Sequence, residues 1–156
     1  MNTDKKISRR EALKRMGFAV MSGAIASSGL LSLASCETKR SKRIIFYFTG
    51  TGNSLYIARQ LAGENAELLS IPQMVKRGKY EFEADEIGIV YPIYGHMPPY
   101  MVRQFIQKAK LKAEYKFAVL TYGARKCDAV EIWDRISRKA DNAFDYISTI
   151  TVSYTH

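Results

Sequence analysis

Apolar residues between positions 43 and 152 follow two patterns, which predict two kinds of element. Continuous runs rich in Ile, Val, Phe and Tyr, bounded by turn residues, predict buried strands. Segments with apolar residues at every third or fourth position predict amphipathic helices. The expected strands are Ile44–Phe48, Ala66–Ile71, Ile87–Tyr91, Tyr115–Tyr122 and Phe144–Val152. The expected helices are Asn53–Gly63, one starting at Pro98-Pro99 and one starting near Cys127, with one helical turn in Pro72–Arg77.

Strands and helices alternate along the chain, which is typical of an α/β protein with a parallel sheet. A wound five-stranded sheet with the order 2-1-3-4-5 binds ligands at the carboxyl ends of its strands, where the order reverses. The loops after the first, third and fourth strands should therefore converge on one crevice. Residues 79–86 predict a charged connector. No helical pattern follows the fifth strand, so one of its faces should lie bare or be covered by another subunit.

The loop after the first strand carries the clearest chemistry, and we call it the phosphate loop. It consists of Thr49, Gly50, Thr51, Gly52, Asn53 and Ser54. Helix N-termini attract anions, and glycines let the backbone approach a phosphate closely. Thr51 and Asn53 are candidate N-cap residues. The loop has neither the Lys of a Walker motif nor a Gly-x-Gly-x-x-Gly pattern. Its neutral donors suit one terminal phosphate monoester.

The phosphate loop resembles that of the flavodoxin-like family, Thr-x-Thr-Gly-x-Thr, with Ser54 at the last Thr position. The resemblance covers residues 43–152, within an expected domain of residues 43–156. It implies a flavodoxin-like wound parallel sheet and the cofactor FMN, whose ribityl phosphate this loop would hold. The alternative is an ordinary Gly-rich turn between a strand and a helix. A related family adds a Cys-rich ferredoxin half, but no Cys-x-x-Cys motif occurs here, so no iron–sulfur cluster is predicted.

By position after the strands, the resemblance assigns the isoalloxazine ring to the other two loops. Tyr94 is the first candidate for stacking on the ring and Tyr122 the second, because aromatic faces suit a planar ring. Either residue could instead be an ordinary core or surface tyrosine. Gly95 and Gly123 would let backbone groups reach the polar edge of the ring. The full set of expected ring-binding residues is Pro92, Tyr94, Gly95, Thr121, Tyr122 and Gly123.

Three further residues carry chemistry without a firm role. His96 either tunes the ring or is a solvated loop histidine, and the second interpretation is favoured. Trp133 lies on a helical stripe, which favours the core over stacking. Cys127 is either a thiol made acidic at a helix start or a plain small residue, and the plain residue is favoured. No catalytic set and no metal site is predicted.

Residues 1–35 predict an export signal. Ser8-Arg9-Arg10-Glu11-Ala12-Leu13-Lys14 resembles a twin-arginine signal, and a weakly apolar segment follows. Leu33-Ala34-Ser35-Cys36 resembles a bacterial lipobox, which implies lipidation at Cys36 and a tether over residues 36–42. The protein would then be anchored to the bacterial cell membrane, facing the periplasm or the outside. The alternatives are an uncleaved anchor, or a chance Arg-Arg pair with a buried cysteine.

Charge changes this picture in one respect. The formal net charge is +9, of which the six basic and two acidic residues of the export signal contribute +4. The remaining +5 favours an acidic redox partner protein or an anionic membrane surface. Nucleic acid is not expected, because no basic stripe with interleaved aromatic residues occurs.

The sequence favours an exported, lipid-anchored, FMN-binding electron-transfer protein. An FMN-dependent reductase of the quinone or nitro type, using NAD(P)H, is one alternative. A flavin-free, truncated binding module is the other. Fold does not decide between them, because function depends on the site. Whether the protein is an enzyme therefore stays open, with the electron carrier preferred.

Overall fold

The computed structural model describes residues 43–152, so the predicted export signal with Arg9 and Arg10, the lipidation site Cys36 and the whole tether lie outside the described residues. Five strands form one sheet in the order β2-β1-β4-β6-β7, and all its pairs are parallel. This order confirms the predicted 2-1-3-4-5 arrangement. The strands are β1 (Arg43–Tyr47), β2 (Ala66–Ser70), β4 (Glu86–Pro92), β6 (Tyr115–Tyr122) and β7 (Tyr146–Thr151).

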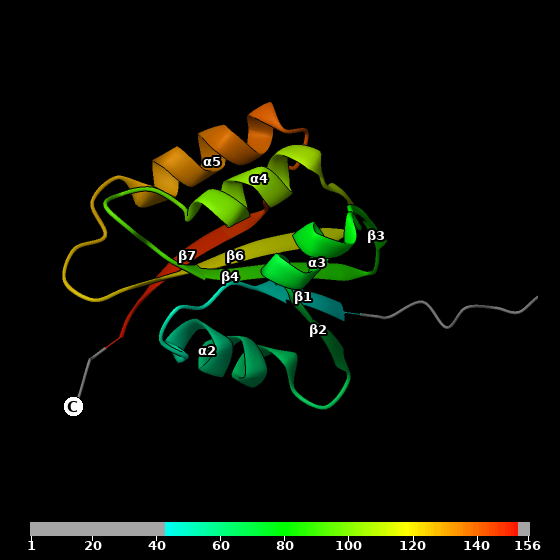
Figure 1. The fold of residues 1–156 in the computed structure, drawn as a ribbon, viewed down its shortest axis with the longest axis horizontal. Coiled ribbons are helices and arrows are strands. Elements are labelled where there is room, and N and C mark those ends of the chain that lie inside the picture. The colour runs from blue at the N-terminus through cyan, green and yellow to red at the C-terminus, as the bar shows by residue number, and fades with distance from the viewer. Residues whose placement is uncertain (1–42, 153–156) are drawn as a thin grey trace, which may run out of the picture. The chain divides into compact units, whose positions relative to one another are not determined.

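Helices cover the two faces of this sheet unequally (Figure 1). One face is covered by α3 (Ile71–Arg77), α4 (Tyr100–Lys108) and α5 (Ala129–Lys139). The other face carries α2 (Asn53–Ala62), which packs on β1, β2 and β4. Within residues 43–152, no helix is long and apolar enough to cross a membrane. Among the described residues, α2 is the helix on its side of the sheet, and its apolar cluster extends as far as Val119 of β6.

The larger core lies on the three-helix face and is rich in aromatic side chains. Phe46 contacts Phe82 and Phe105, at centroid distances of 4.7 and 5.0 Å. Trp133 lies 5.0 Å from the Tyr91 ring and 5.3 Å from the Phe144 ring. Trp133 is fully buried, which confirms its expected place in the core. The α2 face holds a smaller cluster of Ile45, Ala58, Ala62, Val90 and Val119.

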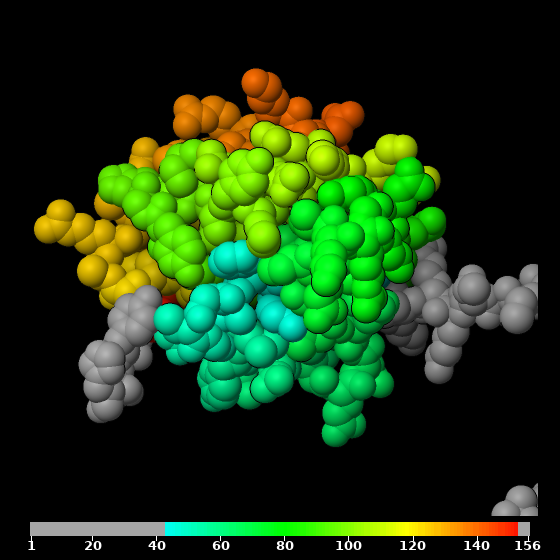
Figure 2. Space-filling view, viewed as in Figure 1, coloured from blue at the N-terminus to red at the C-terminus, as the bar shows by residue number. Residues whose placement is uncertain are grey.

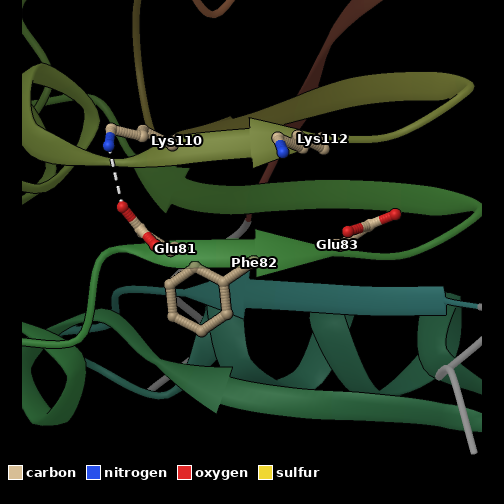
Figure 3. Close-up of a pocket in the computed structure, with 5 residues that line it drawn as sticks. All are labelled: Glu81, Phe82, Glu83, Lys110 and Lys112. Atoms are coloured by element: carbon tan, nitrogen blue, oxygen red, sulfur yellow. Dashed lines mark hydrogen bonds and ion pairs between the residues drawn. The ribbon is translucent and has the colours of Figure 1, made fainter.

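Two short strands were not predicted. The expected connector at residues 79–86 contains β3 (Glu81–Glu83), which pairs in parallel with β5 (Lys110–Lys112). Phe82 and Leu111 are buried in the core, whereas the flanking charged residues are exposed. Figure 3 shows Glu81 and Lys110 directed toward each other. Lys110 donates a hydrogen bond of 2.8 Å to Glu81, which lowers the pKa of that exposed carboxyl. A strand of three residues, with one apolar residue between two charged residues, is too short for its alternation to be recognised in the sequence.

The start of α5 also differs from its prediction. The helix begins at Ala129, two residues after the expected start near Cys127. Cys127 has φ = 44°, in the left-handed region, so it cannot continue a right-handed helix. It is an exposed free thiol in the loop that precedes α5.

Asn142 ties the ends of several elements together. Its Oδ1 accepts a hydrogen bond of 3.2 Å from the Leu111 N–H in β5. Its Nδ2 donates to the carbonyls of Ile106, Ala109 and Ala140 at 3.2, 2.8 and 2.9 Å. The side chain is buried, with 1% of its surface exposed. It thus joins the end of α4 and the start of β5 to the turn that follows α5.

Tyr91 predicts a measurable pH dependence of stability. Its hydroxyl is buried and has no hydrogen-bond partner among the described residues, and burial raises its pKa well above the ordinary value. The folded state then resists ionisation where the unfolded chain ionises, so stability should fall as the pH rises above about 10. Tyr91→Phe should unfold at equal or higher urea concentration at neutral pH and should lose less stability in alkali.

Urea unfolding, followed by the fluorescence of the single tryptophan, measures this difference. Tyr100→Phe is the matched control, because Tyr100 is 70% exposed. This substitution should change neither the urea midpoint at neutral pH nor the loss of stability in alkali. The account of Tyr91 is refuted if Tyr91→Phe and the original protein lose the same stability between neutral and alkaline pH.

Candidate functional site

Three loops lie together at the carboxyl edge of the sheet. They are the phosphate loop, the loop of residues 93–99 after β4 and the loop of residues 123–128 after β6. Their strands are adjacent and parallel, so the loops leave the sheet at the same end, on the left of Figure 1. In Figure 2 the cyan, green and yellow surfaces of these segments gather at that end.

The phosphate loop is held by its own side chains and by its glycines. The Gly52 N–H donates a hydrogen bond of 2.9 Å to Thr49 Oγ1. Gly52 has φ = 93° and is the N-cap of α2, and its carbonyl accepts the first helical hydrogen bond, from Tyr56, at 2.9 Å. The prediction that Thr51 or Asn53 caps the helix is wrong, because no side chain makes a capping hydrogen bond there.

The consequence is that the side chains of Thr51 and Asn53 stay available to a ligand. Thr51 is exposed, and Asn53 is the half-buried first residue of α2. The first N–H groups of a helix lack partners within the helix, and its dipole favours negative charge at this end. The first turn of α2 contains no acidic residue, so no carboxylate competes with an anion.

Ser54, the last residue of the phosphate loop, is paired with Thr121 at the end of β6. Their hydroxyl oxygens are 2.8 Å apart, and both side chains are almost completely buried. The bond joins the first turn of α2 to the end of β6, two segments 67 residues apart in sequence. Both residues were predicted to bind the cofactor. In this arrangement they hold the loop in place through each other, which residue type and strand position alone did not reveal.

Tyr94 reaches over the phosphate loop from the second loop. It begins a tight turn in which Tyr94 and Met97 exchange backbone hydrogen bonds of 3.0 and 3.1 Å. The two central residues, Gly95 and His96, have φ values of 55° and 72°, as a type I′ turn requires. The Tyr94 side chain is 51% exposed, and its hydroxyl lies against Gly50. A Cβ on Gly50 would be 2.6 Å from that hydroxyl, so a glycine leaves the needed space.

His96 joins the second loop to the third. Its Nδ1 lies 3.2 Å from Asp128 Oδ1, and both side chains are more than half exposed. His96 is thus solvated, as favoured from the sequence, but it also has a partner. Asp128 was not singled out in the sequence, because nothing in its neighbourhood indicates that the two loops meet. The third loop also carries two exposed cations, Arg125 and Lys126.

The remaining predicted residues lie at the same edge without a described side-chain contact to the phosphate loop. Pro92 and Tyr122 are the half-buried last residues of β4 and β6. Gly123 follows Tyr122 and is half-buried, whereas Gly95 is exposed at the turn. The Ile93 N–H donates to the Thr121 carbonyl at 2.8 Å and keeps the second and third loops together at their base.

This architecture and strand order define a flavodoxin-like α/β fold. Solved structures of the same fold include the two-electron reduced flavodoxin of Megasphaera elsdenii, with 16% identity, a TM-score of 0.53, and coverage of 72% of this chain and 88% of that one. A flavoprotein from Lactobacillus acidophilus in complex with FMN has 12% identity and a TM-score of 0.51, and the match covers 70% of this chain and 93% of that one. The Trp repressor binding protein of Bacillus subtilis has 11% identity and a TM-score of 0.52, and the match covers 72% of this chain and 85% of that one. No protein-family profile and no curated protein matches the chain.

Proposed function

We propose that this protein binds FMN non-covalently and transfers electrons as an exported, lipid-anchored carrier. The observation that carries the proposal is the phosphate loop at the start of α2, uncharged and free of side-chain caps, with Tyr94 reaching over Gly50. Structures of the same fold support it, since one is a flavodoxin and another is a flavoprotein in complex with FMN.

The residues of the site fit a phosphate monoester joined to a planar ring. The backbone N–H groups at the start of α2 and the side chains of Thr49, Thr51 and Asn53 would bind the phosphate. The hydrogen bond between Ser54 and Thr121 would fix the end of the loop to β6. Tyr94 would offer its exposed ring to the isoalloxazine, with backbone groups of the second and third loops at the polar edge of the ring. FMN would supply the electron-transfer chemistry, and the protein would orient it.

Export and anchoring belong to the same proposal. Arg9 and Arg10 would direct the chain to a twin-arginine route, which carries folded proteins and so suits a flavin inserted before export. Lipidation of Cys36 would then hold the domain at the membrane. The basic character of the domain would favour an acidic redox partner. Mass spectrometry of the membrane-bound protein tests the anchor, and an unmodified Cys36 would refute it.

The first experiment is the visible absorption spectrum of the protein purified without residues 1–35. We expect a flavin spectrum and the release of FMN on denaturation. A colourless protein that also fails to take up added FMN would overturn the proposal and leave a flavin-free binding module. Oxidation of NADH or NADPH by the flavin-loaded protein would indicate the reductase alternative in place of the carrier.

The positive charge at the third loop predicts that the second reduction potential of the bound flavin is raised. Arg125 and Lys126 are exposed beside the proposed ring site, and a positive field stabilises negative charge added to the flavin. We expect a less negative second reduction potential than in an acidic relative. Replacing both cations by glutamate should make this potential more negative by tens of millivolts, with the shift shrinking at high salt.

A potentiometric titration measures this shift. The matched control reverses two distant exposed cations, Lys76 and Arg77 at the end of α3, and should change the potential much less. Equal shifts from the two double variants would show that the third loop has no local effect on the flavin.

A further inference from the structure

The two edge strands of the main sheet differ in how well they are protected from other chains. An edge strand offers unpaired backbone groups, and natural proteins protect it with charges, prolines or bulges. On one edge, β2 carries the exposed charge Glu67 at its second position. On the other edge, β7 has the sequence Tyr-Ile-Ser-Thr-Ile-Thr, with no charge, proline or glycine. Among the residues that the structure describes, the β7 edge is therefore the open one.

Within residues 43–152, nothing covers the side of β7 that faces α2, and this side is also apolar. Tyr146 is 54% exposed and Ile150 is 38% exposed. Ile150 borders a hollow of about 450 Å³ whose opposite wall is formed by Tyr56 and Ile57 of α2. Ile147, on the other side of the strand, packs against the larger core. Because strand side chains alternate, Tyr146, Ser148 and Ile150 share the α2 side.

We propose that β7 pairs antiparallel with β7 of a second copy of this chain, forming a symmetric dimer with a continuous ten-stranded sheet. The pattern of the strand is self-complementary about Ser148. A two-fold axis at that residue places Tyr146 of each copy opposite Ile150 of the other copy, with both side chains on the same side of the sheet. Pairs of an aromatic and a β-branched residue are among the stabilising cross-strand pairs. This inference does not depend on the binding of FMN.

The neutral strand favours a second copy over an acidic partner, because β7 offers no cation to such a partner. A neutral contact also brings no like charges together, although each domain is basic overall. No charged residue lies within β7, and the charged residue next to it, Asp145, would face Thr151 of the partner instead of another Asp145. The dimer also closes on itself, because the remaining edges carry Glu67. A six-residue strand pair is a small interface, so a reversible dimer is expected.

A cysteine scan of the full chain tests this register. With Cys36 and Cys127 replaced by serine, Ser148→Cys should form a disulfide-linked dimer under oxidation with copper phenanthroline. Directly opposed residues of an antiparallel pair have Cα atoms about 4.5–5.5 Å apart, within reach of a disulfide. Thr149→Cys should cross-link poorly, since it faces residue 147 of the partner. Glu67→Cys, on the other edge, should not cross-link.

Sedimentation equilibrium of the full chain gives an independent readout. The original protein should show a dimer mass at micromolar concentration. Ile150→Lys should be a monomer, because it would place a charge opposite Tyr146 of the second copy. Glu67→Lys adds a cation at the opposite edge and should leave the dimer intact. A monomeric original protein, or cross-linking of Glu67→Cys as efficient as that of Ser148→Cys, would overturn the proposal. The bare face would then be left to a different protein.

Discussion

Thr51→Glu is expected to weaken FMN binding about 100-fold, equivalent to about 2.7 kcal/mol, without unfolding the domain. The phosphate loop contains no charged residue, and Thr51 is exposed within it. A carboxylate there would lie close to the proposed phosphate, and two like charges about 5 Å apart repel by about 3 kcal/mol at an effective dielectric constant of about 20. The same carboxylate interacts favourably with the α2 dipole, so the helix should remain stable.

Riboflavin and a neutral variant separate this effect from a general disturbance of the loop. Fluorescence titration of the apoprotein should give similar riboflavin affinities for Thr51→Glu and the original protein, because riboflavin lacks the phosphate. Thr51→Gln, with the same size and no charge, should lose less than about tenfold of the FMN affinity. If FMN and riboflavin weaken equally in Thr51→Glu, the phosphate is not bound by this loop.

The strands and the phosphate loop were predictable because their signals are local. Two strands are continuous apolar runs, Ile44-Ile45-Phe46 in β1 and Ile87-Gly88-Ile89-Val90 in β4. The structure buries both runs between the helices on the two faces of the sheet. A strand followed by small polar residues and a helical stripe indicates an anion site before any contact is known. The order of the strands was implied by the resemblance to the flavodoxin-like family, because the rules of connection give only parallel strands with right-handed crossovers.

The support of the site was not predictable, because it is made by pairs far apart in sequence. Ser54 and Thr121 each match the family pattern by position, yet their common hydrogen bond depends on how α2 and β6 pack. His96 and Asp128 meet because a type I′ turn and a left-handed Cys127 direct two loops toward each other. Gly95 suits such a turn, but the positive φ of His96 and of Cys127 is not marked in the sequence, because residues other than Gly uncommonly adopt it.

The same distinction explains why Asn142 was overlooked. In the sequence it is a polar residue beside Asp141, after a helix, where an exposed turn is the ordinary expectation. In the structure it is buried and satisfies one backbone N–H and three carbonyls from separate segments. Burial of an amide is tolerated when its hydrogen-bonding groups are paired, and the partners here come from tertiary packing.

Asn142→Ala should therefore lower the free energy of unfolding by about 3–5 kcal/mol, a large part of the stability of a domain of this size. The alanine makes none of the four hydrogen bonds, so the Leu111 N–H and the carbonyls at the end of α4 lose their side-chain partner. Each such group buried without a partner costs about 1–3 kcal/mol. The loss should appear as a lower urea midpoint with an unchanged slope.

Asn65→Ala is the matched control for this change. Asn65 is an exposed asparagine in the turn between α2 and β2, so water can replace whatever its side chain contacts. Its substitution should change the free energy of unfolding by less than about 0.5 kcal/mol. Similar midpoints for the two variants would mean that the Asn142 amide does not join α4, β5 and α5. A large difference would show that one buried amide holds together the ends of α4 and α5 and the strand β5.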